Sequence, residues 1–329
     1  MALKPEDTVG PARREIRVKN RTISRRQAVT ALALGTHAIA ATRPAIASDA
    51  AASCAGDPGG GRDVPQAVVR RGYLEGAYGQ VHYRFAGRAA RARPLLMLHP
   101  SPLSSEVFEL FMREMGRDRI VVAPDTPGYG LSDPPPGPPQ IADYATSMHA
   151  LTRKLGWDPF DVFGYHTGSN TAVEMAHQQP GRIRHVVLNG ASIYSEEELA
   201  AARRQYAPRP VGDRPALLAA RWPTFHDQAW RMLCGDARAL NILLESHRNA
   251  DRSQWGFLAS QAYPLSARLA EVSQPTLVLC PEDDLWDLTR RAHRLLRNGR
   301  VVEFPGWTHG YLDSRATEVG SLLRDFLDA

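Results

Sequence analysis

A histidine stands at the centre of the segment Gly164-Tyr165-His166-Thr167-Gly168, which has the frame of a nucleophile elbow. Residues 161–163 before it predict the end of a strand, and residues 169–178 after it predict a helix. In such a strand–turn–helix the small flanking residues allow a sharp turn, which pushes the central side chain out at the carboxyl edge of a parallel sheet. The central residue is normally Ser, Asp or Cys. His166 is therefore both the candidate reactive group and a departure from the usual pattern.

Four further apolar runs predict strands, and each is followed by a polar motif that could take part in chemistry. They are residues 95–98 before His99-Pro100-Ser101-Pro102, 120–123 before the segment Asp125 to Ser132, 276–280 before Pro281-Glu282-Asp283-Asp284, and 301–304 before Trp307-Thr308-His309. Helical stretches such as residues 141–155 alternate with these runs. The alternation requires crossover connections, so it predicts a parallel sheet covered by helices on both faces.

The order of these motifs closely resembles that of the α/β-hydrolase fold family over residues 68–329. That order is an oxyanion loop, a D-x-P-G-x-G-x-S turn, the elbow, an acid after a late strand and a histidine after the last strand. The pattern is similar to those of epoxide hydrolases, dehalogenases and esterases, with His in place of the elbow nucleophile. The resemblance implies an α/β-hydrolase fold, with a mostly parallel central sheet, helices on both faces and a helical cap insertion.

The resemblance also implies roles for individual residues. Asp284 matches the acid, with Asp283 as the fallback, and His309 matches the base. An imidazole in that role needs a carboxylate on its far nitrogen, which fixes the tautomer and stabilises the charged form. The family's oxyanion hole consists of two backbone amides, which correspond here to Ser101 and Thr167.

The oxyanion loop departs from the family pattern at one position. Pro100 replaces the usual Gly and has no N–H group, but the family's donor is the next residue, so the hole can survive. By the same resemblance, His99 supports this loop and does not face the substrate.

His166 admits three interpretations. As a nucleophile it would attack an activated ester, thioester or lactone, and water would then hydrolyse the acyl-imidazole with His309 as base. As a general base it would activate water or abstract a substrate proton, which gives hydrolysis or a cofactor-free lyase or C–C cleavage reaction. As the remnant of a lost nucleophile it would leave a protein that only binds a ligand.

No metal or other cofactor is expected. Imidazole and carboxylate groups at one sheet edge suit zinc. In the family layout, however, His99 supports its loop and the acid faces the base. The three cysteines show no C-x-x-C spacing, so neither a zinc knuckle nor a redox motif is indicated.

Residues 193–265 interrupt the alternation of strands and helices and are mostly helical in character, which predicts the cap. The α/β-hydrolase core then comprises residues 66–192 and 266–329. Aromatic residues of the cap, together with one near His309, are candidates for a substrate pocket. We expect the pocket to contain Trp222, Phe225, Trp230 and Trp307.

The basic character of the chain is confined to its beginning. The net charge is +5, yet residues 1–47 hold nine Lys or Arg against three Asp or Glu, so the remainder is slightly acidic. The rest of the chain therefore has no basic excess that would indicate a nucleic-acid partner, and we expect a small-molecule substrate instead.

Residues 1–47 predict a signal peptide of the twin-arginine type. Arg25 and Arg26 precede a mildly apolar stretch, residues 28–41, and the segment ends in Ala45-Ile46-Ala47, which resembles a cleavage site. The apolar stretch is shorter than the roughly 20 residues that a membrane span needs, so no stable span is expected in the mature chain. Residues 48–65 predict a flexible linker. The protein is accordingly expected in the periplasm or outside the cell.

Taken together, the sequence predicts an exported α/β-hydrolase that acts on a small ester-like or otherwise activated substrate through His166, His309 and Asp284. Two alternatives stay open: a cofactor-free lyase or C–C cleaving enzyme of the same fold, and a noncatalytic ligand-binding protein.

The first prediction concerns export. Fused to a reporter, residues 1–47 should direct translocation of a folded cargo, because paired arginines before an apolar stretch are the mark of the twin-arginine route. Replacing both arginines by lysine (Arg25→Lys with Arg26→Lys) should abolish it. Continued export of the double variant would contradict the assignment to this route.

Overall fold

The computed structural model describes residues 66–89, 91–207, 212, 215–216, 219 and 229–329 of the 329-residue chain. The expected signal peptide, residues 1–47, and the expected linker, residues 48–65, lie outside the described residues.

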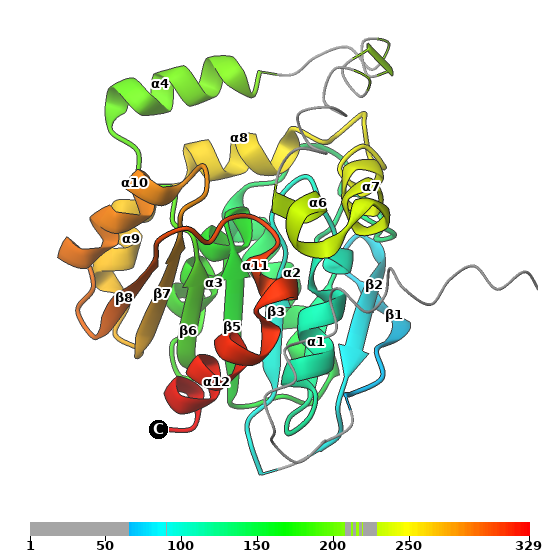
Figure 1. Cartoon of the computed structure of the whole chain (residues 1–329), viewed down its shortest axis with the longest axis vertical. Helices are drawn as coiled ribbons and strands as arrows, with labels where there is room; N and C mark the ends of the chain where they lie inside the picture. The colour runs from blue at the N-terminus through cyan, green and yellow to red at the C-terminus, as the bar shows by residue number, and fades with distance from the viewer. Residues whose placement is uncertain (1–65, 90, 208–211, 213–214, 217–218, 220–228) are drawn as a thin grey trace, which may run out of the picture. The chain divides into compact units, whose positions relative to one another are not determined.

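An eight-stranded sheet runs through the centre of the structure (Figure 1), in the order β1-β2-β4-β3-β5-β6-β7-β8. β1 and β2 pair antiparallel, β2 is antiparallel to β4, and all later neighbours are parallel. The mostly parallel α/β-hydrolase sheet predicted from the sequence is thereby confirmed. The strands are β1 (Arg70–Gly76), β2 (Gly79–Ala86), β3 (Leu95–Leu98), β4 (Val121–Pro124), β5 (Phe160–Tyr165), β6 (Ile183–Asn189), β7 (Thr276–Pro281) and β8 (Gly299–Phe304).

Helices cover both faces of the sheet, and alternate residues of the buried strands supply the two cores. Leu95 and Met97 of β3 belong to one hydrophobic cluster, whereas Leu96 and Leu98 belong to the other. This period of two is what a strand buried on both faces requires. The helices of the core are η2 (Ser105–Phe108), α1 (Glu109–Met115), α2 (Ile141–Lys154), α3 (Thr167–Gln178), α9 (Leu265–Glu271), α10 (Trp286–Arg290), η4 (Arg291–Arg294), α11 (Tyr311–Ser314) and α12 (Ala316–Leu327).

The segment expected to form the cap contributes four described helices, which Figure 1 shows together at one end of the sheet. They are α4 (Glu196–Gln205), α6 (Ala229–Cys234), α7 (Asp236–Glu245) and α8 (Trp255–Ala262). α8 lies directly on the loop after β3, because a Cβ atom at Gly256 would stand only 1.9 Å from Ser101 Oγ. The cap helix and the expected oxyanion loop are therefore packed against each other.

A buried carboxylate ties the loops at this end of the sheet together. Asp125, just after β4, accepts hydrogen bonds from the Ser105 amide at 2.8 Å, the Leu131 amide at 2.9 Å and His82 Nδ1 at 2.8 Å. Burial raises the pKa of Asp125, but the hydrogen bonds from His82, Ser105 and Leu131 together have the larger effect. The net result is a pKa of about 2, below the ordinary value. Asp125 therefore stays charged at neutral pH and holds the turn that follows β4 against the loop that follows β3.

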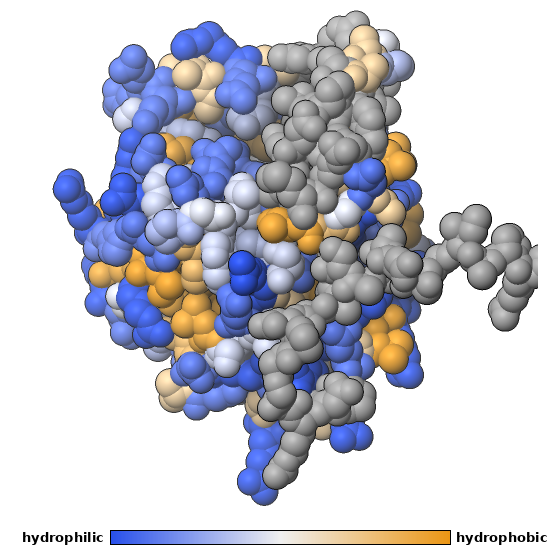
Figure 2. Space-filling view, in the orientation of Figure 1, coloured by the Kyte–Doolittle hydropathy of each residue, from blue (hydrophilic) through white to orange (hydrophobic). Residues whose placement is uncertain are grey.

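The surface is mixed in character. Figure 2 shows hydrophobic residues in several separate patches among hydrophilic ones on the visible face. Among the described residues, the large apolar side chains that are exposed are Val68, Tyr73, Leu131, Leu240 and Leu244. None of the described helices combines the length and the apolar character that crossing a bilayer demands.

The elbow between β5 and α3 depends on two glycines with no room for a side chain. A Cβ atom at Gly164 would lie 2.4 Å from the Gly168 carbonyl oxygen, and one at Gly168 would lie 2.1 Å from the Leu98 carbonyl oxygen. Because both obstacles are backbone atoms, the clash cannot be relieved by rotating a side chain. The absence of these two Cβ atoms lets α3 start close against β3 and β5.

The second prediction follows from this close packing. Gly168→Ala should lower the free energy of unfolding by about 3 kcal/mol or more, because the added methyl group forces the backbone of two elements apart. The matched control is Gly181→Ala, where a Cβ atom has no neighbour within 4 Å. Urea denaturation of both variants measures the difference, and equal stabilities would contradict this account of the elbow.

Candidate active site

His166 occupies the strained turn at the tip of the elbow. Its backbone angles are φ 49° and ψ −109°, and among the described residues it is the one non-glycine with a positive φ. A conformation of this kind costs about 1–3 kcal/mol and persists only where its surroundings hold it. The His166 amide donates to the Asn189 carbonyl at 2.9 Å, and the His166 carbonyl accepts from the Ser169 amide at 2.8 Å. β6 and the first turn of α3 therefore fix the residue from both sides.

The side chain of His166 pairs with Asp283, in the loop after β7. His166 Nε2 donates to Asp283 Oδ2 at 2.9 Å. The carboxylate side chain is 1% exposed and the imidazole 15% exposed, so water screens the pair poorly. Asp283 Oδ1 in turn accepts from the Leu285 amide at 2.9 Å, which fixes the direction of the carboxylate.

The charge of this pair sets the basicity of the imidazole. Burial lowers the pKa of His166, but the charge of Asp283, the hydrogen bond to it and the charge of Asp284 together raise the pKa above its ordinary value. The result is a stronger base than a free imidazole, held next to a carboxylate that stabilises its protonated form.

His309, in the loop after β8, pairs with the neighbouring carboxylate. His309 Nε2 donates to Asp284 Oδ1 at 2.7 Å, and Nδ1 lies 3.1 Å from the Tyr165 hydroxyl. Burial raises the pKa of Asp284, but the hydrogen bond from His309 and the charges of His166 and His309 bring it below its ordinary value. The carboxyl group at position 284 is therefore ionised at neutral pH.

We expected the two imidazoles to act in one His–His–Asp constellation, but the structure forms two separate His–Asp pairs. The rings of His166 and His309 lie side by side, with centroids 5.6 Å apart at an angle of 70°, and no hydrogen bond joins them. The physical reason is that two adjacent carboxylates are present, and each takes its own imidazole. Asp283, considered only as a fallback, is the partner of the elbow residue.

The two imidazoles differ in the nitrogen that they leave free. Both nitrogens of His309 are engaged, by Asp284 and Tyr165. In contrast, His166 Nδ1 has no hydrogen-bond partner anywhere in the described part of the chain. Because a carboxylate can only accept, the neutral His166 ring carries its hydrogen on Nε2 and its lone pair on Nδ1. The available base of the site is thus the Nδ1 atom of His166.

The expected oxyanion hole is closed by a side chain. The Ser101 amide donates to Thr167 Oγ1 at 2.7 Å, and this hydroxyl donates to Ser101 Oγ at 3.1 Å. The Ser101 amide is therefore not free, in contrast to the expectation, because the β-branched hydroxyl of Thr167 reaches it first. A substrate oxygen would have to displace the Thr167 hydroxyl from the amide or bind to that hydroxyl itself.

His99 lies behind the loop. Its Nε2 accepts from the Thr126 amide at 2.8 Å, and its Nδ1 donates to the Pro100 carbonyl at 3.0 Å. Burial lowers the pKa of His99, although the charge of Asp125 and the bond to Pro100 oppose this, so the ring is neutral. It joins the loop after β3 to the turn after β4 and has no nitrogen left for a substrate.

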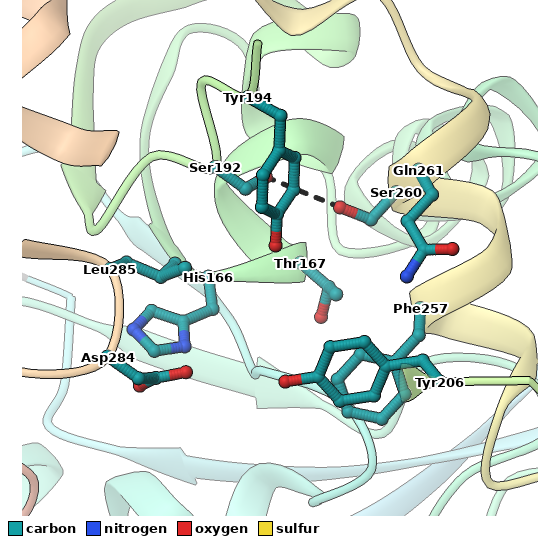
Figure 3. A pocket seen from close by; sticks show the side chains of 10 residues that line it. All are labelled: His166, Thr167, Ser192, Tyr194, Tyr206, Phe257, Ser260, Gln261, Asp284 and Leu285. Atoms are coloured by element: carbon teal, nitrogen blue, oxygen red, sulfur yellow. Dashed lines mark hydrogen bonds between the residues drawn. The ribbon is translucent and has the colours of Figure 1, made fainter. Parts of the chain in front are cut away.

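A cavity of about 380 Å³, partly open to solvent, lies beside His166. Figure 3 shows the imidazole at one side of it, next to the Asp284 carboxylate, with residues of α8 on the opposite side. The cavity is lined by His166, Thr167, Ser192, Tyr194, Tyr206, Phe257, Ser260, Gln261, Asp284 and Leu285.

The aromatic residues expected in the substrate pocket lie elsewhere or outside the described residues. Trp222 and Phe225 belong to the undescribed positions. Trp230 is buried in a hydrophobic core against Gly310, and Trp307 stacks on Phe304 with ring centroids 4.7 Å apart. Both tryptophans pack against neighbouring core residues, and neither lines the cavity.

Sequence reasoning missed most of the polar lining. Ser192 and Tyr194 directly follow β6, so their position after a parallel strand was a signal that could have identified them. Ser260 and Gln261 come from α8, and nothing in the sequence indicates which face of that helix meets the cavity.

One group among the described residues has the donor atoms of a metal site. His166, Asp283 and Asp284 offer ligand atoms that all lie within 4.8 Å of one another. One imidazole and two carboxylates suit zinc by their chemistry. In this structure, however, both carboxylates accept hydrogen bonds from imidazoles.

Gly190 makes room for an imidazole at the elbow. It has φ +78°, and a Cβ atom there would lie 2.6 Å from His166 Cδ2 and 3.0 Å from His166 Nε2. A side chain at this position would therefore push the His166 ring away from Asp283.

The third prediction is that Gly190→Ala lowers the pKa of His166, because the displaced ring loses its carboxylate partner while it stays partly buried. Gly235→Ala is the control: Gly235 has a similar φ of +81° but no neighbour within 4 Å of its Cβ position. Both variants carry the backbone penalty of about 1–2 kcal/mol for a positive φ, but only the first should change the NMR titration of His166. A pKa unchanged by Gly190→Ala would contradict the geometry described here.

Comparison with known proteins agrees with this architecture. The model of the alpha/beta hydrolase fold family matches residues 93–225. An uncharacterized hydrolase of Saccharomyces cerevisiae is 27% identical over 124 residues, which are 36% of this chain and 40% of that protein. Haloalkane dehalogenase 2 of Mycobacterium tuberculosis is 29% identical over 130 residues, or 39% of this chain and 44% of that protein. The matches thus span less than half the length of these curated relatives.

Solved structures extend the similarity to most of the chain. An esterase from Thermogutta terrifontis superposes with a TM-score of 0.65 at 20% identity, covering 79% of this chain and 98% of the other. The enol-lactonase from Burkholderia xenovorans gives a TM-score of 0.67 at 20% identity, covering 78% and 100%. At this level of identity the similarity concerns the fold. The sheet order, the elbow and the matched family model together show that the chain has the α/β-hydrolase fold.

Proposed function

We propose that this protein is an esterase-like hydrolase in which His166, oriented by Asp283, activates a water molecule against the acyl carbon of a small ester or lactone. The observation that carries the proposal is that the two nitrogens of the His166 ring have different surroundings. Nε2 is hydrogen-bonded to a buried carboxylate at 2.9 Å, whereas Nδ1 has no partner among the described residues and belongs to a residue that lines the cavity. A base, an orienting acid and an adjoining substrate space are the parts that general-base catalysis needs.

The reaction can be written without a covalent enzyme intermediate. His166 Nδ1 takes a proton from water as the water oxygen bonds to the acyl carbon. The C–O bond to the leaving alcohol then breaks, and the proton on Nδ1 passes to the leaving oxygen, so the products are a carboxylic acid and an alcohol. Asp283 holds the Nε2 hydrogen throughout and stabilises the transient imidazolium, as the acid does in a catalytic triad.

The electrostatics suit a base at position 166. The carboxylates raise the pKa of His166, which increases its capacity to accept a proton in the transition state. The same pairing of a buried carboxylate with an imidazole serves general bases in other hydrolytic sites. In this proposal His309 positions Asp284, whose pair with His309 lies at the edge of the cavity.

A second candidate is favoured by the closed oxyanion hole. Because Thr167 Oγ1 occupies the Ser101 amide, the site has no open pair of backbone donors for a tetrahedral intermediate. Proton abstraction from a carbon or hydroxyl group of the substrate by His166 does not form such an intermediate. A cofactor-free lyase or C–C cleaving reaction of this kind is therefore the alternative to ester hydrolysis.

The proposal includes export from the cytoplasm. It rests on the twin-arginine-like features of residues 1–47, which lie outside the described residues.

The fourth prediction tests the role of the elbow imidazole. His166→Ala should lower turnover of activated esters and lactones by about 10² to 10⁴, because a positioned base is lost. The variant should also be less stable, because the buried Asp283 carboxylate loses its imidazole partner, so its folding is measured separately. His293→Ala is the control: this imidazole is 50% exposed and pairs with Glu303 outside the cavity lining. Steady-state kinetics on an ester panel, with circular dichroism for folding, give the comparison.

Two outcomes would contradict the role of His166 as base. Wild-type rates in His166→Ala would remove any active role for the ring. Loss of wild-type activity to a chelator, with recovery on addition of zinc, would make His166 a metal ligand instead.

A further inference from the structure

The cavity beside His166 is lined mainly by hydrogen-bonding side chains. Hydroxyl groups are contributed by Thr167, Ser192, Tyr194, Tyr206 and Ser260, and an amide by Gln261. Only Phe257 and Leu285 are wholly apolar. The rings of Tyr194, Tyr206 and Phe257 also give the lining an apolar surface, so the site suits a ligand that combines polar groups with an apolar face.

The side-chain amide of Gln261 is buried but forms no hydrogen bond with any described residue. The residue is 6% exposed, and its Oε1 atom is enclosed. Figure 3 shows the amide nitrogen of this side chain on the side of Phe257 and the cavity, and the amide oxygen on the other side. Gln261 thus offers its amide N–H groups to whatever fills this space.

The hydroxyl of Tyr194 is also available. It has no hydrogen-bond partner among the residues that the structure describes, and burial raises its pKa to about 12, with the neighbouring Tyr206, Asp284 and Glu198 acting in the same direction. The group therefore stays protonated and can both donate and accept. Ser260 Oγ, which accepts from Asn170 Nδ2 at 2.7 Å, lies 3.4 Å from Ser192 Oγ, so this pair of serines also presents hydroxyl groups at the cavity wall.

The charge of the lining excludes an anionic ligand. Among the described lining residues there is no Lys or Arg, and Asp284 is ionised. A carboxylate or phosphate on the substrate would be repelled by Asp284 and would find no Lys or Arg among these residues to pair with. The substrate that fits this lining is neutral.

One wall of the cavity is flat and aromatic. Tyr206 and Phe257 stack with ring centroids 4.3 Å apart and planes within 14° of parallel. Such a face buries the C–H surface of a saturated ring, while the polar groups around it bind the ring substituents.

We propose that the substrate is a small, neutral, polyhydroxylated ring, of the kind found in a sugar-derived lactone or ester, with Gln261 and Tyr194 as the residues that select its hydroxyl groups. Hydroxyl groups donate and accept at once, so they can accept from Gln261 and pair in either direction with Tyr194 and the two serines. This inference rests on the proposed hydrolase function and adds the substrate class.

The test measures binding separately from turnover, by calorimetry on the full chain. The probes are D-glucono-1,5-lactam and the unsubstituted lactam 2-piperidone, two neutral six-membered rings that differ in their hydroxyl groups and resist hydrolysis. The hydroxylated lactam should bind at least about tenfold more tightly, because only it satisfies the buried polar groups. Equal affinity, or no binding of either lactam, would overturn the proposal.

Variants assign the preference to residues. Gln261→Leu should remove most of it, and Tyr194→Phe, which deletes one hydroxyl and keeps the ring, should reduce it. Gln254→Leu is the matched control, because Gln254 also has an enclosed, unpartnered Oε1 but does not line the cavity. Thermal unfolding checks that each variant folds. A preference that survives in both Gln261→Leu and Tyr194→Phe would overturn the assignment.

Turnover of D-glucono-1,5-lactone and δ-valerolactone separates this inference from the function on which it rests. Faster hydrolysis of the hydroxylated lactone supports both. Selective binding of the hydroxylated lactam without hydrolysis of either lactone would leave the substrate class supported and the hydrolase function refuted. Hydrolysis of both lactones at equal kcat/KM would refute the substrate class and leave the hydrolase function standing.

Discussion

The hydrogen bond between His166 and Asp283 is the interaction on which the chemistry of the site depends. It requires a strained backbone at the elbow, a carboxylate buried after β7, and a glycine at position 190 that leaves room for the ring. Each of these features is unfavourable or restrictive by itself. Together they fix one imidazole with one nitrogen satisfied and the other unpaired beside the cavity. A functional site that carries local strain of this kind is what a reactive, positioned group requires.

The two His–Asp pairs divide the roles that one imidazole plays in an ordinary triad. In a triad the base bridges the acid and the nucleophile, so both of its nitrogens are used. Here His309 is also used on both sides, by Asp284 and Tyr165, and has none left for a substrate. In our proposal the elbow residue acts as the base, and Asp283, the carboxylate beside Asp284, orients it. One additional carboxylate would then account for a base at the position that normally holds the nucleophile.

The sequence was sufficient to predict the fold, because the alternation of strands and helices and the order of the motifs carry it. It also identified the elbow and the residues around it. The pairing within the site could not be predicted, since two consecutive carboxylates differ only in side-chain direction, which the chain order does not encode. The Thr167 hydroxyl on the Ser101 amide depends on a single rotamer. The face of α8 that lines the cavity could not be predicted for a similar reason. The orientation of a cap helix depends on packing, here of Gly256 on Ser101, and not on its composition.

The pH dependence of kcat/KM in the wild-type protein and in Asp283→Asn tests the central claim most directly. A base must be unprotonated, so activity should be lost as the pH falls through the pKa of His166, which Asp283 and Asp284 hold above its ordinary value despite burial. In Asp283→Asn the carboxylate that raises the pKa of His166 is gone, whereas burial still lowers this pKa. The acidic limb of the profile should therefore move to lower pH, and the maximal rate should fall. A limb that stays in place in Asp283→Asn, or that moves only in Asp284→Asn, would contradict the account.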